Sequence, residues 1–304
     1  MRHLLKLSDL TRADICQILD LADQLKFDLK HGVSRQPLLG KTLAMIFAKS
    51  STRTRVSFET GIYQLGGLGM FLSSQDLQLG RGEPISDTAR VLGRYVDGIM
   101  IRTFAQDDVE QLARYSGVPV INGLTDYAHP CQILADLMTI REKQTALEGG
   151  KICFIGDGNN VCNSLIVGAK LCGMTISVAC PKGHEPHESA TQFAGESLTL
   201  TTDPMEAAAG ADVVYTDVWA SMGQEAEAAE RARIFNPYQV NAELMRAAKP
   251  KAMVLHCLPA HRGEEITEDV LEAHADEIFE QAENRLHAQK AVMCLLMGDR
   301  KGQF

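Results

Sequence analysis

Short apolar runs alternate with amphipathic segments along most of this chain. The runs are rich in β-branched residues, as strands are, and the segments between them carry apolar residues at helical spacing. Strands that alternate with helices pair in parallel, because each helix returns the chain to the starting edge of the sheet. The sequence therefore predicts an α/β protein with doubly wound parallel sheets.

At 304 residues the chain is long enough for about two domains of roughly 150 residues each. We expect a junction at 146–150, which ends in Gly149-Gly150, and a last helix over 276–297 that folds back onto the first half. The predicted strands are 42–47, 69–72, 98–102, 118–122, 151–155, 175–179, 198–201, 213–216 and 253–258. The other predicted helices are 54–65, 85–95, 108–115, 130–143, 163–171, 187–193, 237–248 and 267–273.

Composition excludes several classes of function. With 39 acidic and 30 basic residues the net charge is −9, which disfavours general nucleic-acid binding. Apolar windows are too short for a membrane helix, and the N-terminus becomes polar too early for a signal peptide, so we expect a cytoplasmic protein. Eight dispersed cysteines lack metal-binding spacing and are read as reduced thiols, so no metal site is predicted.

A dense set of anion donors follows the first predicted strand. Ser51-Thr52-Arg53-Thr54-Arg55 leads directly into a predicted helix. At such a helix N-terminus, backbone N–H groups and the helix dipole favour an anion, and arginines and hydroxyls add further donors. Because the chain is acidic overall, this local cluster is the place where we expect a small phosphate compound.

A second motif, His129-Pro130-Cys131-Gln132, begins another predicted helix after a strand. Proline is harmless in the first helical turn, where its missing N–H has no acceptor. In a parallel sheet all strands end at one edge, so His129 and Gln132 are expected near the Arg53 cluster.

The turn Gly156-Asp157-Gly158-Asn159-Asn160 follows a predicted strand and has part of a dinucleotide-binding pattern. The third glycine is missing, and the next strand ends in Cys180-Pro181-Lys182 without an acidic residue for a ribose. A dehydrogenase is therefore disfavoured. The turn presents two amide side chains at a strand end.

Two further polar segments end strands in the second half. Asp217, followed by Ser221-Met222-Gly223, offers a carboxylate that suits a cationic substrate group. His256-Cys257-Leu258-Pro259 ends the last predicted strand, and we favour a positioning or proton-linked role for Cys257 over a covalent one. The charged stretch 225–233 is interpreted as a solvated helix face.

Taken together, these motifs resemble the aspartate/ornithine carbamoyltransferase family, in its ornithine branch, over nearly the whole chain. The resemblance implies two domains with the active site in a cleft between them: a carbamoyl-phosphate domain at 1–134, onto which the helix 284–304 packs back, and an ornithine domain at 150–283. It assigns Arg102, His129 and Cys257 to catalysis. Carbamoyl phosphate would contact Ser51, Thr52, Arg53, Thr54, Gln78, Arg102, His129, Pro130, Cys131, Gln132, Cys257, Leu258 and Arg285. Ornithine would contact Asn160, Asp217, Ser221 and Met222.

The family reaction transfers the carbamoyl group to the δ-amine of L-ornithine, giving L-citrulline and phosphate for arginine biosynthesis. The resemblance implies no cofactor and no metal. It also implies a homotrimer, with the loop carrying Gln78 reaching into a neighbouring subunit's site, and leaves open whether trimers assemble further.

Other readings stay open at this point. Carbamoyltransferases acting on putrescine, N-acetylornithine or aspartate are rivals within the fold, although Asp217 would repel a dicarboxylate. From other classes, an NAD-dependent dehydrogenase and a phosphate-sensing module without catalysis remain alternatives.

Overall fold

The computed structural model describes residues 1–77, 82–144, 146–220 and 227–298. Its chain forms two compact units. Unit 1 comprises Met1–Ala135 and Arg285–Phe304, and unit 2 comprises Asp136–Asn284. The boundaries between the units fall within helix α5 (Pro130–Gln144) and helix α12 (Ala275–Met297).

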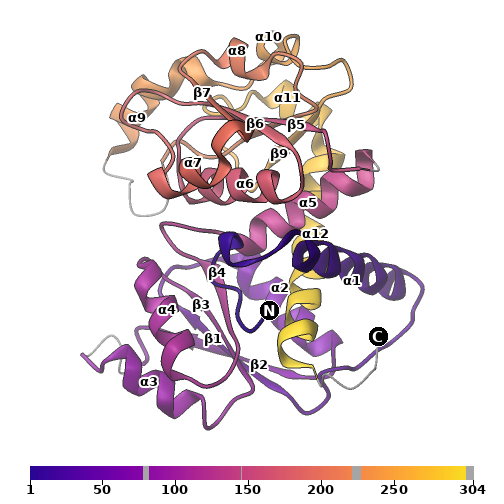
Figure 1. Ribbon diagram of the computed structural model, residues 1–304, viewed down its shortest axis with the longest axis vertical. Helices are drawn as coiled ribbons and strands as arrows, with labels where there is room; N and C mark the ends of the chain where they lie inside the picture. Colours follow the sequence, from indigo (N-terminus) through magenta and orange to yellow (C-terminus); the bar gives the residue numbers. More distant parts are fainter. Residues whose placement is uncertain (78–81, 145, 221–226, 299–304) are drawn as a thin grey trace. The chain divides into compact units, whose positions relative to one another are not determined.

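Unit 1 contains a four-stranded sheet of order β2-β1-β3-β4, in which every neighbouring pair is parallel. The order reverses between β1 and β3, which is where parallel α/β sheets open a crevice for ligands. Phe47, the last residue of β1, lies opposite Arg102, the last residue of β3. The strands are β1 (Thr42–Phe47), β2 (Leu68–Ser73), β3 (Gly98–Arg102) and β4 (Val120–Leu124). The helices, drawn around them in Figure 1, are η1 (Leu7–Asp9), α1 (Arg12–Lys30), α2 (Thr52–Gln64), α3 (Ile85–Leu92) and α4 (Gln106–Tyr115).

Helix α1 was not among the helices predicted from the sequence, although the signals that indicate it are local. Thr11 and Asp14 form a capping box, in which each side chain accepts from the other's backbone N–H. Apolar residues at helical spacing, such as Ile15, Ile18 and Leu25, are buried along one face.

Unit 2 contains a five-stranded parallel sheet of order β7-β6-β5-β8-β9. Its order reverses between β5 and β8. The strands are β5 (Lys151–Ile155), β6 (Thr175–Ala179), β7 (Leu198–Thr201), β8 (Val213–Thr216) and β9 (Met253–His256). The helices are α6 (Asn160–Leu171), α7 (Glu188–Ala194), η3 (Gly195–Ser197), α8 (Pro204–Ala208), α9 (Ala228–Phe235), η5 (Asn236–Tyr238), α10 (Ala242–Met245) and α11 (Glu268–Ala273).

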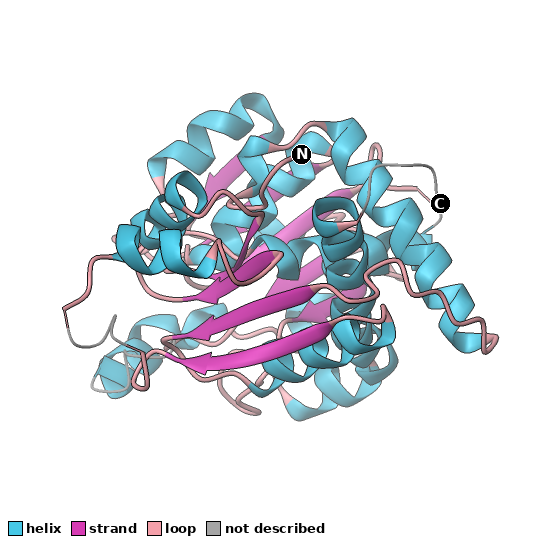
Figure 2. Ribbon diagram, turned by 90° about the horizontal axis from the view of Figure 1, so that it is seen from below, coloured by secondary structure: helices cyan, strands magenta, loops and turns pink. Residues whose placement is uncertain are grey.

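Both sheets are flanked by helices (Figure 2), and their central strands are buried. The burial of β1, β3, β5, β8 and β9 agrees with their continuous apolar runs, which strands covered on both faces require. The predicted fold class, parallel α/β sheets in two units, is confirmed.

Several predicted boundaries differ from the structure by two or more residues, and in three places the physical reason is visible. Strand β9 ends at His256 rather than at 258, because Leu258 has a φ of 56°, in the left-handed region that a strand cannot contain. Strand β4 begins and ends two residues later than predicted, because 123 and 124 extend its pairing with β3 through a register shift. The predicted helix 237–248 is instead η5 and α10, since Val240 between them forms a bridge to Ile266.

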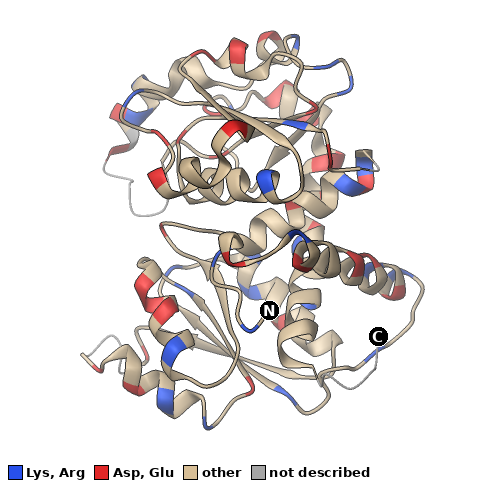
Figure 3. Ribbon diagram, viewed as in Figure 1, with Lys and Arg blue, Asp and Glu red and all other residues tan. Residues whose placement is uncertain are grey.

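No described helix is long and apolar enough to cross a membrane. Basic and acidic residues are interspersed along the ribbon of both units (Figure 3), and the net charge of the chain is −9.

Candidate active site

The polar motifs lie at the carboxyl ends of the strands, around the point where each sheet reverses its order. In unit 1 the chain leaves β1 toward Ser51 and leaves β3 at Arg102. In unit 2 it leaves β5 toward Asn159 and leaves β8 at Asp217. Each unit thus has a polar half-site where ligands of parallel α/β proteins bind.

Helix α2 directs its N-terminus into the half-site of unit 1. Ser51 is its N-cap, and Ser51 Oγ accepts a hydrogen bond from the N–H of Thr54 at 3.1 Å. The N–H groups of Thr52 and Arg53 also belong to the first turn, which has no helical acceptors for them. An anion beside this turn gains both these donors and the positive end of the helix dipole.

Arg285 of α12 binds two residues of the predicted site that are distant in sequence. Its Nη1 donates to Oε1 of Gln132 at 2.7 Å, and its Nη2 donates to Oγ1 of Thr54 at 3.2 Å. Arg285 is 3% exposed and these partners are neutral, so neither cancels its charge. The planar guanidinium, held by these two side chains, is suited to an anionic ligand.

His129 lies in the same positive environment. Burial, followed by the charges of Arg285, Arg102 and Arg53, lowers the pKa of His129 well below its ordinary value of 6.5. His129 is therefore a neutral imidazole at neutral pH. It can donate or accept a hydrogen bond, but it does not add a further positive charge.

Cys131 belongs to the interior rather than to the chemistry. Its Sγ donates to the carbonyl oxygen of Asn122 at 3.3 Å, and burial raises the pKa of the thiol to about 12. A thiol with such a pKa is not a nucleophile at neutral pH. Its neighbour Pro130 begins helix α5.

Two of the cavities lined by described residues of unit 1 bear on the location of the site. One of ≈ 400 Å³ lies at the junction of β1 and α2, lined by Phe47, Ser51, Thr52 and Phe71 among others. A larger one of ≈ 510 Å³ lies at the C-terminal ends of α1 and α2. We place the site at the first cavity, because only there do strand ends and a helix N-terminus supply donors.

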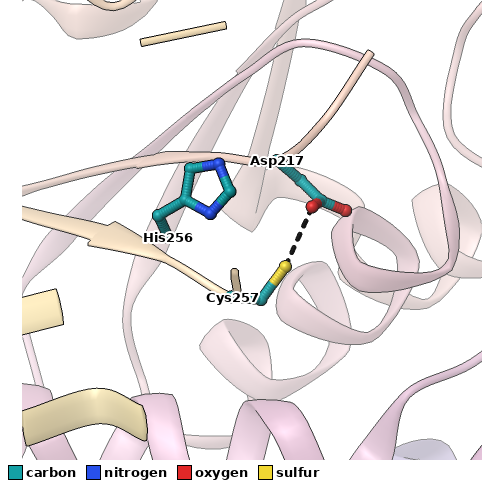
Figure 4. Close-up of side chains that lie close together, drawn as sticks. All are labelled: Asp217, His256 and Cys257. Carbon is teal, nitrogen blue, oxygen red and sulfur yellow. Dashed lines mark hydrogen bonds between the residues drawn. The ribbon is translucent and has the colours of Figure 1, made fainter. Parts of the chain in front are cut away.

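Asp217 is the centre of the half-site in unit 2. Its Oδ1 accepts from Sγ of Cys257 at 2.9 Å and from the N–H of Val218 at 2.8 Å, and its Oδ2 accepts from Nδ2 of Asn159 at 2.8 Å. Figure 4 shows the carboxylate and the thiol facing each other. The side chain is held in one orientation at the strand end, as a binding carboxylate must be.

Asn160 is the residue that the family resemblance implies, but Asn159 is the one that contacts Asp217. Asn159 is also the N-cap of α6, where its Oδ1 accepts from the N–H groups of Val161 and Cys162. Its position directly before the helix is the signal that could have identified it. Asn160 Oδ1 accepts from the N–H of Val161.

His256 holds the segment that follows β9. Its Nδ1 accepts from the N–H of Leu258 at 2.9 Å, so the ring proton is on Nε2, which donates to Oε1 of Glu265 at 2.9 Å. Both side chains are fully buried. This pair stabilises Leu258 in a left-handed conformation that costs a non-glycine residue about 1–2 kcal/mol.

Asp217, His256 and Cys257 lie close enough to suggest a metal site. Both nitrogens of His256 are already engaged, however, one as an acceptor and the other as a donor. A metal ligand needs a lone pair on the ring nitrogen. The contacts of His256 therefore leave this cluster without its histidine ligand.

The glycine turn after β5 is filled by the chain itself. A Cβ on Gly158 would lie 2.2 Å from the backbone nitrogen of Pro186. Asp157 pairs with Arg231, and its Oδ1 lies 3.5 Å from Nδ1 of His184. The close backbone approach that a dinucleotide needs is used for internal packing, which argues further against a dehydrogenase.

Arg231 corrects the interpretation of 225–233 as a solvated face. It lies on α9 and is only 5% exposed. Its Nε donates to the carbonyl oxygen of Trp219, and its Nη2 donates to Asp157. Arg231 thus ties α9 to two strand ends of the half-site. The predicted residues Gln78, Ser221 and Met222 lie outside the described residues.

Comparison with known proteins gives the family. Residues 2–142 match the model of the aspartate/ornithine carbamoyltransferase carbamoyl-P binding domain, and residues 148–296 match that of the Asp/Orn binding domain. The chain belongs to the aspartate/ornithine carbamoyltransferase family.

Relatives within the family cover nearly the whole chain. An ornithine carbamoyltransferase of Carboxydothermus hydrogenoformans is 58% identical, with 98% of each chain covered. An anabolic ornithine carbamoyltransferase of Pyrococcus furiosus is 55% identical, covering 99% of this chain and 98% of the relative. A solved structure of ornithine carbamoyltransferase from P. furiosus matches with a TM-score of 0.94 at 54% identity, over 99% of this chain and 98% of that one.

Proposed function

We propose that the protein transfers the carbamoyl group of carbamoyl phosphate to the δ-amine of L-ornithine, producing L-citrulline and phosphate in arginine biosynthesis. The observation that carries this proposal is the pair of half-sites. Unit 1 gathers buried cations around a helix N-terminus, which suits a phosphate compound, and unit 2 presents a fixed carboxylate, which suits an amine. The close relatives named ornithine carbamoyltransferase support the same substrates.

We assign carbamoyl phosphate to residues 1–134 with the helix 284–304, and ornithine to 150–283. The phosphate would accept from Ser51, Thr52, Arg53 and Thr54 at the start of α2. The carbamoyl group would contact Arg102, His129, Gln132 and Arg285 together with the backbone of Pro130, Cys131, Cys257 and Leu258. Asp217 with Asn160, Ser221 and Met222 would hold the amino acid.

The reaction forms one bond and breaks one. The lone pair of the neutral δ-amine forms a C–N bond with the carbonyl carbon, and a tetrahedral oxyanion develops. When the oxyanion collapses, the C–O bond to phosphate breaks, phosphate leaves with that electron pair, and the proton lost by the amine nitrogen is taken up by the departing phosphate. The carbamoyl donor is already activated by its phosphate, so these steps draw on no cofactor.

Three side chains are proposed to stabilise the oxyanion. Arg102 supplies charge, and neutral His129 supplies a hydrogen bond. Thr54 Oγ1 accepts from Arg285, so its own proton is left to donate toward the substrate. A well-aimed donor of this kind contributes about 3–4 kcal/mol to transition-state stabilisation.

Holding both substrates together supplies the rest of the rate enhancement. It can lower the activation barrier by up to about 7–11 kcal/mol when the alignment is good. An amine with a pKa of about 10 is mostly protonated at neutral pH, so the site must select the free base. We assign Asp217 and Cys257 to the α-amino end, which leaves the δ-amine free to lose its proton.

The proposal is tested by measuring carbamoyl transfer from carbamoyl phosphate to four acceptors: ornithine, putrescine, N-acetylornithine and aspartate. We expect ornithine to have the highest kcat/KM. A higher value with one of the other three would identify a related carbamoyltransferase instead. Phosphate binding without carbamoyl transfer to any of the four acceptors would indicate a phosphate-sensing module instead.

We propose further that the protein is a cytoplasmic homotrimer. Exposed apolar side chains on α2 and on the edge strand β2, namely Val56, Tyr63, Leu68 and Phe71, support a protein interface there. Gln78 follows β2 in sequence and is proposed to reach a neighbouring subunit's site. Mixed trimers of Arg53→Ala and Gln78→Ala chains should then regain activity that neither variant has alone. Sedimentation of the wild type should give the mass of three chains. A monomer with full activity would contradict this proposal.

A further inference from the structure

Gln289, which the sequence analysis did not single out, contacts the buried arginine of unit 1. It lies on α12 four residues after Arg285, so both side chains project from one face of the helix. Gln289 is fully buried. A buried amide must find partners for both its oxygen and its nitrogen.

Hydrogen counting fixes the orientation of this amide. Ser57 Oγ has one proton and donates it to the carbonyl oxygen of Arg53 at 2.7 Å. The guanidinium of Arg285 can only donate, so the atom of Gln289 that faces it must be the amide oxygen, and the amide nitrogen then lies 2.6 Å from Ser57 Oγ. The amide oxygen consequently accepts from Nη2 and Nε of Arg285 at 2.9 and 3.1 Å.

In this orientation three neutral side chains clamp the guanidinium of Arg285. Gln289 holds Nε and Nη2, Thr54 holds Nη2, and Gln132 holds Nη1. The same amide reaches the backbone of Arg53 through Ser57. One residue therefore connects Arg285 with the first turn of α2, where the phosphate is proposed to bind.

We infer that Gln289 is a positioning residue for carbamoyl phosphate, holding the guanidinium of Arg285 and the first turn of α2 in the geometry that binds the anion. The inference rests on the proposed function. Because Gln289 is neutral, it fixes the arginine without cancelling its charge, as a carboxylate in its place would. Its effect is therefore specific to the anionic substrate.

The test replaces Gln289 with leucine, which has nearly the same size but no polar atoms. We expect the KM for carbamoyl phosphate and the Kd for inorganic phosphate to rise about tenfold, the factor given by one lost hydrogen bond to a charged group. The ornithine KM, measured at saturating carbamoyl phosphate, should stay within about twofold. An unchanged carbamoyl phosphate KM, or equal rises for both substrates, would overturn the inference.

Lys290→Met is the matched control. Lys290 is also buried on α12 and donates to Oε1 of Gln64 on α2 at 2.9 Å, but this contact does not involve Arg285. We expect a lower Tm with both KM values unchanged. A rise in the carbamoyl phosphate KM equal to that of Gln289→Leu would reduce the role of Gln289 to general helix packing.

Ser57→Ala gives a second readout if Gln289→Leu folds poorly. It removes the partner of the amide nitrogen, so Gln289 can rotate, and we expect a smaller rise in the carbamoyl phosphate KM. In the variant that carries both Gln289→Leu and Ser57→Ala, the two effects on the carbamoyl phosphate KM should not add, because both substitutions break the same series of contacts. Additive effects would contradict the inference. A wild type that forms no citrulline would instead refute the proposed function.

Discussion

The thiol of Cys257 donates a hydrogen bond to Oδ1 of Asp217 across 2.9 Å, and so connects the carboxyl ends of β9 and β8. The other carboxylate oxygen, Oδ2, is held by Asn159 at the end of β5. Three adjacent strands thereby contribute to one fixed carboxylate. We assign that carboxylate to the amino acid substrate.

Asp217→Asn should raise the ornithine KM strongly, roughly ten- to a hundredfold, because a hydrogen bond between charged groups is replaced by a neutral one. Carbamoyl phosphate binding should stay nearly intact, because the side chains assigned to its phosphate all lie in unit 1. Steady-state kinetics with each substrate varied in turn measures both values. Equal losses for the two substrates would count against the assignment of Asp217 to ornithine.

His256 offers a pair of variants that separate its two contacts. In His256→Asn an amide atom takes the place of Nδ1 and can still accept from Leu258, whereas in His256→Gln an amide atom takes the place of Nε2 and keeps the contact with Glu265. If the segment of Cys257 and Leu258 must be fixed for catalysis, kcat falls less in the asparagine variant. The difference should be about tenfold, the effect of one lost hydrogen bond. Equal kcat values for the two variants would show that the contact with Leu258 does not matter.

Gly158→Ala should destabilise the fold by about 3 kcal/mol or more, since its Cβ would overlap the backbone of Glu185 and Pro186 and neither can move independently. Gly183→Ala is the control. Gly183 has a positive φ but open space around it, so only backbone strain of about 1 kcal/mol is expected. Denaturant unfolding of both variants measures the difference, and a Gly158→Ala variant as stable as the control would disprove the tight packing of this turn.

His129 makes stability depend on pH in a defined direction. Because the folded state lowers the pKa of His129 below 6.5, the unfolded chain binds the extra proton more readily below that pH. Its contribution therefore favours folding above about pH 6.5 and is lost progressively as the pH falls. His129→Gln cannot be protonated, so between about pH 7.5 and about pH 5 it should lose less unfolding free energy than the wild type. An equal loss of unfolding free energy in the wild type and in His129→Gln would argue against a buried neutral imidazole at position 129.

Much of the fold could be predicted because its signals are local. Strands such as β5 and β8 are continuous apolar runs, and Ser51 and Pro130 begin helices with ordinary terminal residues. Boundaries were wrong where tertiary contacts decided them, as at Val240, which bridges to Ile266.

The site was predictable only in part. Arg285 lies 153 residues from Gln132 and 231 from Thr54, so no spacing rule could bring them together, and only the family resemblance did. Gln289 and Arg231 had no such signal. An amphipathic pattern does not show which polar residue of a helix is buried against another polar side chain. Gln289 and Arg231 were therefore recognised only from their burial and contacts.

The most direct test of the central claim is the initial rate of citrulline formation from carbamoyl phosphate and ornithine, measured for the wild type and for Arg53→Ala. We predict that the wild type releases citrulline and phosphate in equal amounts. In Arg53→Ala we predict a fall in kcat/KM of about a hundredfold or more, since a charged donor to the leaving phosphate is lost. A wild type that makes no citrulline, or an Arg53→Ala variant with unchanged activity, would contradict the account.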